Sequence, residues 1–173
     1  MLIILGGLPG AGKTTLAREL ARQLSAVHIR IDSIEQAVRE SGVTVASLDD
    51  AGYRVGYAVA EDNLRLGRLV IADSVNPLPI TRDAWLAVAS RAKVAAAEIE
   101  VECSDDREHR RRVEQRLTDE PGLNGPTWQD VVSRDYRSWD REHFAIDTAG
   151  RTVEQCVTML LAALPLAVPG NRP

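Results

Sequence analysis

The chain has 173 residues, 45% of them hydrophobic and 27% charged, which suits one compact domain with its own core. Its formal net charge of −4 disfavours long duplex nucleic acid and anionic membranes as partners, because both select a broad basic surface. Two cysteines, Cys103 and Cys156, are too few for a disulfide scaffold or a four-cysteine metal site. The sequence has neither a signal-peptide pattern nor an apolar run of membrane-spanning length, so we expect a soluble cytoplasmic protein.

The first half of the chain alternates short apolar runs with segments of helical spacing. The apolar runs that predict buried strands are Leu2–Leu5, Val27–Ile31 and Leu69–Ala72. Helices are predicted where apolar or aromatic side chains recur on one face, at residues 14–24, from about residue 33, and at 53–66. The segment 41–50 lacks this spacing and is predicted as a loop.

The second half repeats the same alternation after a breaker, the sequence NPLP at residues 76–79. Strands are predicted at residues 97–103 and 144–146. Helices are predicted at residues 82–91, from 105 to about 117, shortly after Trp128, and at 153–164. The Gly- and Pro-containing segment 118–128 is predicted as a loop, and residues 166–173 as a frayed tail.

Five short strands separated by helices predict an α/β fold. Parallel neighbours need crossover connections, so the helices are expected on both faces of a five-stranded parallel sheet, in three layers. We predict a single domain over residues 1–165, with a small lid at about 105–127. Ligands of such sheets bind beyond the carboxyl ends of the strands, so the residues that follow each strand are the candidates for function.

The sequence GLPGAGKT at Gly7–Thr14 fits the pattern G-x-x-x-x-G-K-[ST] and lies between a predicted strand and a predicted helix. Glycines let successive backbone N–H groups surround a phosphate, and the helix N-terminus adds positive potential. Lys13 can reach the β- and γ-phosphates, while the Thr14 hydroxyl can ligate magnesium. The predicted nucleotide-binding residues are Gly7, Leu8, Pro9, Gly10, Ala11, Gly12, Lys13, Thr14 and Thr15.

The sequence DTAG at Asp147–Gly150 has the D-x-x-G form of a GTPase switch, but it follows the last predicted strand instead of standing beside the γ-phosphate. No N-K-x-D guanine signature occurs in the chain. We therefore interpret this segment as lying near the base of the nucleotide or as a purely structural turn. The choice between ATP and another nucleoside triphosphate is not encoded in these motifs.

Four stretches together resemble the small P-loop kinases of the nucleoside-kinase superfamily. They are GGLPGAGKTTLAREL, IRIDSIEQAV at 29–38, NLRLGRLVIADSVN at 63–76 and EVECSDDREHRRRVEQR at 100–116. The resemblance runs from Met1 to about Leu164 and is to the branch with chloramphenicol phosphotransferase, zeta-toxin kinases and the kinase half of polynucleotide kinase. It implies an AAA-type ATP-binding kinase that uses magnesium.

Two carboxylates are candidates for chemistry at the carboxyl ends of strands. Asp32 could take the proton of an acceptor hydroxyl, and the resembling kinases place their substrate-activating aspartate at the matching position. Alternatively, Asp32 or Ser33 caps the following helix. Asp73 resembles a Walker B carboxylate that reaches magnesium through water, or it forms a turn before Ser74. Which of the two aspartates is the base stays open.

The segment DDREHRRRVEQR carries five arginines, of which Arg112 and Arg116 are four residues apart and share a helix face. In the resembling kinases such a pair lies at the edge of a mobile lid and neutralises charge during transfer. The alternatives are a solvated face whose arginines pair with neighbouring acids, or a small RNA-binding patch. We predict catalytic roles for Lys13, Asp32, Arg112 and Arg116.

Three further residues, Tyr53, Arg54 and Tyr57, lie where this superfamily builds its acceptor site, although tyrosines at helical spacing are commonly core. Asn76 is a weaker candidate for the acceptor pocket, and His28, His109 and His143 have no metal-ligand spacing. The predicted function is ATP- and magnesium-dependent phosphoryl transfer to a hydroxyl of a small-molecule or nucleoside-like acceptor. The alternatives are a regulatory ATPase without an acceptor and a polynucleotide 5′-kinase.

Overall fold

A computed structural model of the chain describes residues 1–42, 48–115 and 125–165. Its sheet has five strands in the order β2-β3-β1-β4-β5, and every neighbouring pair is parallel. The strands are β1 (Leu2–Gly6), β2 (Val27–Arg30), β3 (Val70–Asp73), β4 (Ala96–Glu102) and β5 (Phe144–Asp147). The predicted parallel α/β sheet is therefore confirmed.

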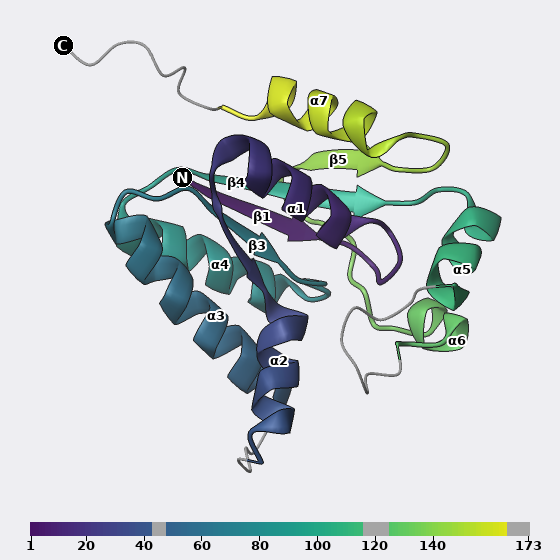
Figure 1. Cartoon of the computed structure of the whole chain (residues 1–173), viewed down its shortest axis with the longest axis horizontal. Coiled ribbons are helices and arrows are strands. Elements are labelled where there is room, and N and C mark those ends of the chain that lie inside the picture. Colours follow the sequence, from purple (N-terminus) through teal and green to yellow (C-terminus); the bar gives the residue numbers. More distant parts are fainter. Residues whose placement is uncertain (43–47, 116–124, 166–173) are drawn as a thin grey trace.

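Helices cover both faces of this sheet, as Figure 1 shows. The described helices are α1 (Lys13–Leu24), α2 (Ile31–Glu40), α3 (Leu48–Arg65), α4 (Pro79–Ala92), α5 (Asp106–Glu114), α6 (Trp128–Val132) and α7 (Val153–Ala163). Helices α1 and α7 pack on one face, and α3 and α4 pack on the other. Helix α2 lies against α3, while α5 and α6 lie beyond the carboxyl end of β4.

Strand β1 explains the three layers, because its side chains alternate between two separate cores. Ile3 and Leu5 pack with residues of α1 and α7, whereas Leu2 and Ile4 pack with residues of α3 and α4. All four side chains have no exposed surface. A strand buried on both faces reads as a continuous apolar run, which is why LIIL could be recognised in the sequence.

Several boundaries differ from the prediction. Helix α3 begins at Leu48, not near residue 53, so the end of the predicted loop 41–50 is helical. Pro79 begins α4 because a proline at the first helical position leaves no hydrogen bond unmade. Strand β2 ends at Arg30, and Ile31 is already the first residue of α2. Most of the predicted loop 118–128 and the tail 166–173 lie outside the described residues.

Within the described ranges, no helix is both long enough and apolar enough to cross a membrane.

Candidate functional site

The loop between β1 and α1 has the backbone that the glycine pattern predicts. Gly7, Gly10 and Gly12 have φ angles of 137°, 85° and 103°, which L side chains rarely adopt. A Cβ atom on Gly7 would lie 2.1 Å from the carbonyl oxygen of Val101 on β4. The loop therefore folds tightly against the end of the sheet, and the amides of the first turn of α1 lie beside it.

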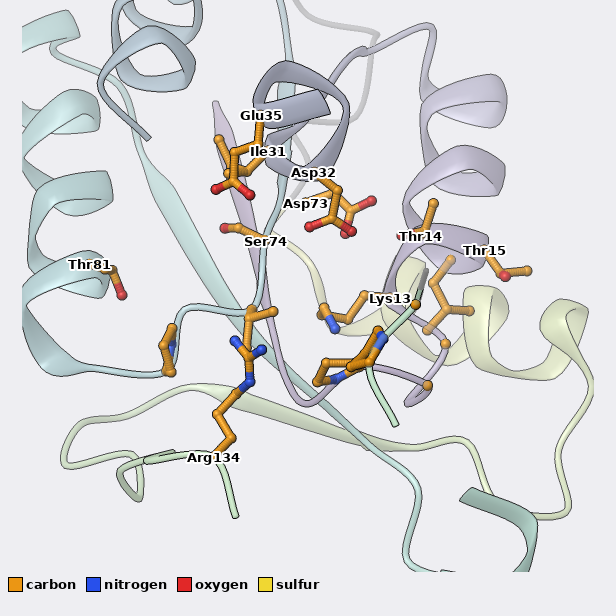
Figure 2. Close-up of a pocket in the computed structure, with 18 of the residues that line it drawn as sticks. Lys13, Thr14, Thr15, Ile31, Asp32, Glu35, Asp73, Ser74, Thr81 and Arg134 are labelled. Atoms are coloured by element: carbon orange, nitrogen blue, oxygen red, sulfur yellow. The ribbon is translucent and has the colours of Figure 1, made fainter. Parts of the chain in front are cut away.

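Lys13 is the first residue of α1, and its side chain folds back over the loop. Its ammonium donates a hydrogen bond of 2.9 Å to the carbonyl oxygen of Leu8. Only 8% of the residue is exposed, although Lys13 lines a large cavity at this end of the sheet, which is described below. Thr14 and Thr15 follow it in the same helical turn and line the cavity as well. Figure 2 shows the Lys13 side chain and the two threonines around this cavity.

Asp73 ends β3 and is 3% exposed. Burial of its carboxyl raises its pKa. Hydrogen bonds from His28 and Thr14 and the charge of Lys13 have the larger, opposite effect, so the net pKa lies below its usual range. His28 donates from Nε2 to Oδ2 of Asp73 over 3.1 Å. The structure thus brings Thr14 and Asp73, the two predicted magnesium ligands, into direct contact and keeps the carboxylate ionised.

Asp32 lies in the first turn of α2 and also lines the cavity. Its side chain is 43% exposed and lies 3.4 Å from the guanidinium of Arg30. In Figure 2 its carboxyl lies near that of Asp73, above Lys13. The capping interpretation is wrong, since the N-cap position is occupied by Arg30 and no side chain caps this helix. The reason is that β2 passes into α2 without a connecting loop.

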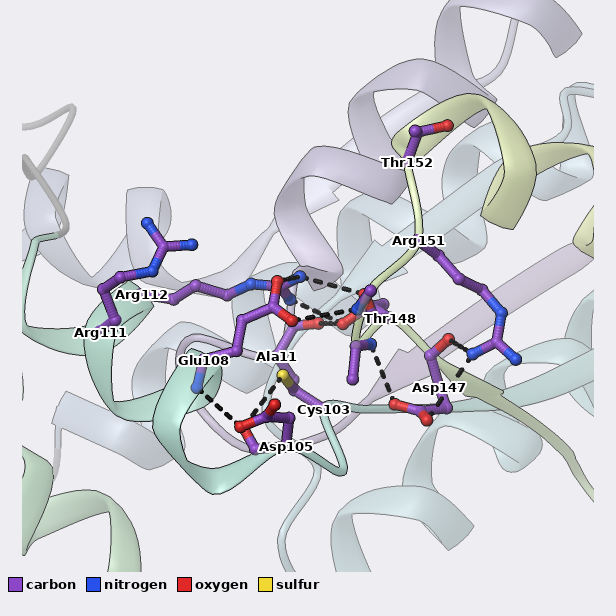
Figure 3. Close-up of polar contacts among 12 residues, drawn as sticks. Ala11, Cys103, Asp105, Glu108, Arg111, Arg112, Asp147, Thr148, Arg151 and Thr152 are labelled. Atoms are coloured by element: carbon purple, nitrogen blue, oxygen red, sulfur yellow. Dashed lines mark hydrogen bonds and ion pairs between the residues drawn. The ribbon is translucent and has the colours of Figure 1, made fainter.

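Arg112 is held against the predicted phosphate loop (Gly7–Thr14) by a network that Figure 3 draws. Its guanidinium donates to Thr148 at Oγ1 and at the carbonyl oxygen, over 2.7 and 3.0 Å, and to Glu108 over 2.6 Å. Thr148 Oγ1 also lies 2.9 Å from the carbonyl oxygen of Ala11 in the loop. Arg112 lines the cavity, whereas its predicted partner Arg116 lies outside the described residues.

Two residues at this site were not singled out from the sequence. His109, interpreted as an ordinary histidine, is buried and donates a hydrogen bond of 2.8 Å from Nε2 to the carbonyl oxygen of Pro9. Its ring also packs edge-on against Trp128, with 5.2 Å between ring centres. Thr148 lies within the DTAG segment, which at least marked its neighbourhood, but nothing local in the sequence marked His109.

One cavity of about 1240 Å³ connects these residues to a second region. One half of the cavity is lined by the predicted phosphate loop, Arg112, Thr148 and the start of α7. The other half is lined by α2, α3, the segment after β3 and the start of α4. Tyr53, Arg54 and Tyr57 all line this second half. Both tyrosines also pack against the core on this face of the sheet, and Tyr57 packs edge-on against the buried Trp85 at 4.6 Å.

Asn76 does not line the cavity. Its side chain is fully buried and donates a hydrogen bond of 2.9 Å to the carbonyl oxygen of Leu5, while its backbone N–H donates to the Tyr53 hydroxyl. Its φ of 49° is the left-handed conformation that asparagine tolerates better than most residues. Asn76 therefore shapes the wall of the cavity from behind, and its predicted contact with an acceptor is wrong.

The sequence of residues 2–132 matches the model of a protein family described as an AAA domain. The chain belongs to this family. The match covers the phosphate loop, both candidate aspartates and Arg112, so all these positions lie inside the family region. A comparison with curated protein sequences finds no match.

Solved structures share the fold at low sequence identity. A proposed kinase from Chloroflexus aurantiacus J-10-fl superposes with a TM-score of 0.74 at 19% identity, over 94% of this chain and 97% of that one. Mycobacterium tuberculosis APS kinase CysC, in complex with AMPPNP and APS, gives 0.67 at 17% identity over 93% and 95%. Chaetomium thermophilum Kti12, in complex with ADP-AlF3, gives 0.64 at 24% identity over 94% and 98%. The chain thus has the fold of P-loop kinases.

Proposed function

We propose that the chain is an ATP- and magnesium-dependent phosphotransferase that moves the γ-phosphoryl group to a hydroxyl of a small-molecule or nucleoside-like acceptor. The observation that carries this proposal is the single cavity, which extends from the phosphate loop past Asp32 to the wall formed by α3. A volume of about 1240 Å³ exceeds the usual range for one small ligand and leaves room for a nucleotide and an acceptor together.

The donor half of the cavity fits a nucleoside triphosphate with magnesium. Lys13 and the loop amides would hold the phosphates, since the glycine loop leaves no side chain between them and an anion. Thr14 and Asp73 offer oxygen atoms, the ligands that magnesium prefers, and their side chains already contact each other. When bound, the ion neutralises charge on the phosphates. Arg112, positioned by Thr148, would add a fixed positive charge.

Asp32 is the proposed base. Its carboxylate would take the proton of the acceptor hydroxyl while the hydroxyl oxygen forms a bond to the γ-phosphorus of ATP. The bond from that phosphorus to the β–γ bridging oxygen breaks, and ADP leaves with the electron pair. Asp73 is less suited to this role, because His28 and Lys13 stabilise its ionised form and lower its pKa, whereas Asp32 is partly exposed to the cavity.

Similar proteins support this assignment without naming an acceptor. The structures of APS kinase and Kti12 contain AMPPNP and ADP, respectively, so nucleotides bind to two proteins of this fold. We further propose that residues 1–165 form one kinase domain and that 105–127 act as its lid. Residues 105–115 would anchor the lid, since His109 and Arg112 contact the phosphate loop or its neighbour Thr148.

The test is transfer from γ-³²P-labelled ATP, with magnesium, to a panel of nucleosides, sugars, aminoglycosides and short 5′-hydroxyl oligonucleotides. Lys13→Ala should abolish transfer. Asp32→Asn should lower the transfer rate by about 10²-fold or more, with little change in ATP affinity. Glu40→Gln is the matched control, because it neutralises an exposed carboxylate at the other end of α2 that is hydrogen-bonded to Gln36. Parental transfer by Asp32→Asn would move the activating role to Asp73.

The same panel separates the alternatives. ADP release that no acceptor accelerates would favour a regulatory ATPase. Transfer confined to the oligonucleotides would identify a polynucleotide 5′-kinase, which the net charge of −4 makes the less expected outcome. Transfer to a small acceptor supports the proposal as stated.

A further inference from the structure

Arg134 follows helix α6 and lines the same cavity as Lys13 and Asp32. Figure 2 shows its side chain extending into the cavity from the opposite side to α2, with the guanidinium beside the segment that follows β3. Within the described ranges, this guanidinium makes no hydrogen bond and no ion pair. It contributes weakly to the low pKa of Asp130, which is due mainly to the Thr127 hydroxyl.

The other arginines of the acceptor half differ from Arg134 in this respect. Arg39 lies 3.6 Å from the carboxylate of Glu35, and Arg54 forms an ion pair of 2.6 Å with Asp50. Their charges are therefore largely balanced by residues on their own helices. Among the residues that the structure describes, Arg134 has no such partner, and its guanidinium extends into the cavity, where it can meet a ligand.

The segment after Arg134 is fixed in place by Arg82, a fully buried residue of α4. The Arg82 guanidinium donates to the carbonyl oxygens of Asn76, Arg137 and Ser138 over 3.0, 2.5 and 3.2 Å. It also lies 4.3 Å from the ring centre of Trp139. This residue therefore joins the segment that carries Arg134 to the segment that forms the acceptor wall, which limits the entropy lost when Arg134 binds a ligand.

We propose that Arg134 forms an anion subsite in the acceptor half of the cavity. The acceptor is then a hydroxy compound that also carries a carboxylate or a phosphate, with the hydroxyl at Asp32 and the anion at Arg134. A guanidinium binds either anion with two parallel hydrogen bonds, and two fixed contacts orient the hydroxyl for transfer. This inference rests on the proposed function and narrows its substrate class.

The test measures binding of matched probes by calorimetry to protein saturated with ADP. D-gluconate is paired with sorbitol, glycerol 3-phosphate with glycerol, and a nucleoside 5′-monophosphate with its nucleoside. At least one anion should bind the parent protein tenfold or more tightly than its neutral partner, which is about 1.4 kcal/mol. The pair that shows the preference distinguishes a carboxylate from a phosphate. If no anion is preferred, the proposal is overturned.

Arg134→Gln should reduce that preference to less than threefold, and Arg134→Lys should retain part of it. Arg137→Gln is the control, because Arg137 is an exposed neighbour that pairs with Asp135 and does not line the cavity. It should keep the parental preference. Equal losses of ADP affinity and anion affinity in Arg134→Gln would assign Arg134 to the nucleotide instead and overturn the proposal.

Adding ATP and magnesium in place of ADP separates this inference from the proposed function. An anion that binds through Arg134 but is never phosphorylated supports the subsite and contradicts the phosphotransferase. Transfer to acceptors with no preference for an anion supports the phosphotransferase and contradicts the subsite. Preferential phosphorylation of the anionic member of a pair, lost in Arg134→Gln, supports both.

Discussion

Arg112→Ala removes the side chain that joins α5 to the phosphate loop through Thr148. The two hydrogen bonds to Thr148 are to uncharged oxygens, and we assign each about 1 kcal/mol. The pair with Glu108 is about a quarter exposed on both sides, so we count about 0.5 kcal/mol for it. The Oε1 of Glu108 loses this partner, but the carboxylate is partly exposed to water and its Oε2 still accepts from the Gly150 N–H.

The expected loss of stability is therefore about 2.5 kcal/mol, which corresponds to a fall in Tm of about 5–10 °C for a chain of this size. Differential scanning calorimetry measures it. Arg110→Ala is the matched control, because the one ion pair of Arg110 within the described part of the chain is an exposed pair with Glu114 on the same helix. That pair contributes less than about 0.5 kcal/mol, so the Tm of the control should fall by less than about 2 °C.

Transfer should fall as well, by about 10²-fold or more in kcat, if Arg112 stabilises the charge that moves during reaction. Arg112→Lys keeps the charge but loses the planar fork, so it should recover part of the rate and little of the stability. Equal Tm values for the Arg112 and Arg110 variants would refute the proposed network. An unstable Arg112→Ala variant with parental kcat would leave Arg112 a purely structural residue.

Three further outcomes are expected. Gly7→Ala places a Cβ 2.1 Å from the carbonyl oxygen of Val101 at a φ of 137°, so denaturant titration should show a loss of about 3 kcal/mol or no folded protein. His109→Phe keeps the ring but not the hydrogen bond to Pro9, and should weaken ATP binding several-fold in calorimetry; parental affinity would mean that this bond does not position the loop. Hydrogen bonds from Ser104 hold the pKa of Asp147 at about 2, below its ordinary value of 3.8, so this group stabilises the fold above pH 3.8 and loses that effect as the pH falls toward 2. Asp147→Asn should flatten the Tm profile in that window, and an unchanged profile would contradict the assignment.

The elements of the fold could be predicted because their signals are local. LIIL reads as a doubly buried strand, and GLPGAGKT specifies a turn whose positive φ angles only glycine accepts readily. Strand ends were placed within about one residue for β3 and β5. The sequence thus determined the α/β class, the phosphate loop and the two aspartates that share the cavity.

The boundary between β2 and α2 could not be predicted, because Ile31 is apolar and suits a buried strand or a buried helix face equally. Packing against α3 and α4 decides between them, since Ile31 belongs to the core on that face of the sheet. This choice places Asp32 in the first turn of α2 and excludes the alternative in which it caps that helix. The local sequence pattern does not report that packing, because a short apolar run fits a strand or a helix.

The contacts that complete the site join residues far apart in the chain. His109 reaches Pro9 across 100 residues, Arg112 reaches Thr148 across 36, and Arg82 reaches Arg137 across 55. A hydrogen bond of this kind leaves no spacing in either segment, because its geometry arises only when the sheet order brings the two segments together. The sequence determined which chemical groups the protein has beside its phosphate loop, and the tertiary structure decided which of them are held in place and which, like Arg134, face the cavity without a partner among the described residues.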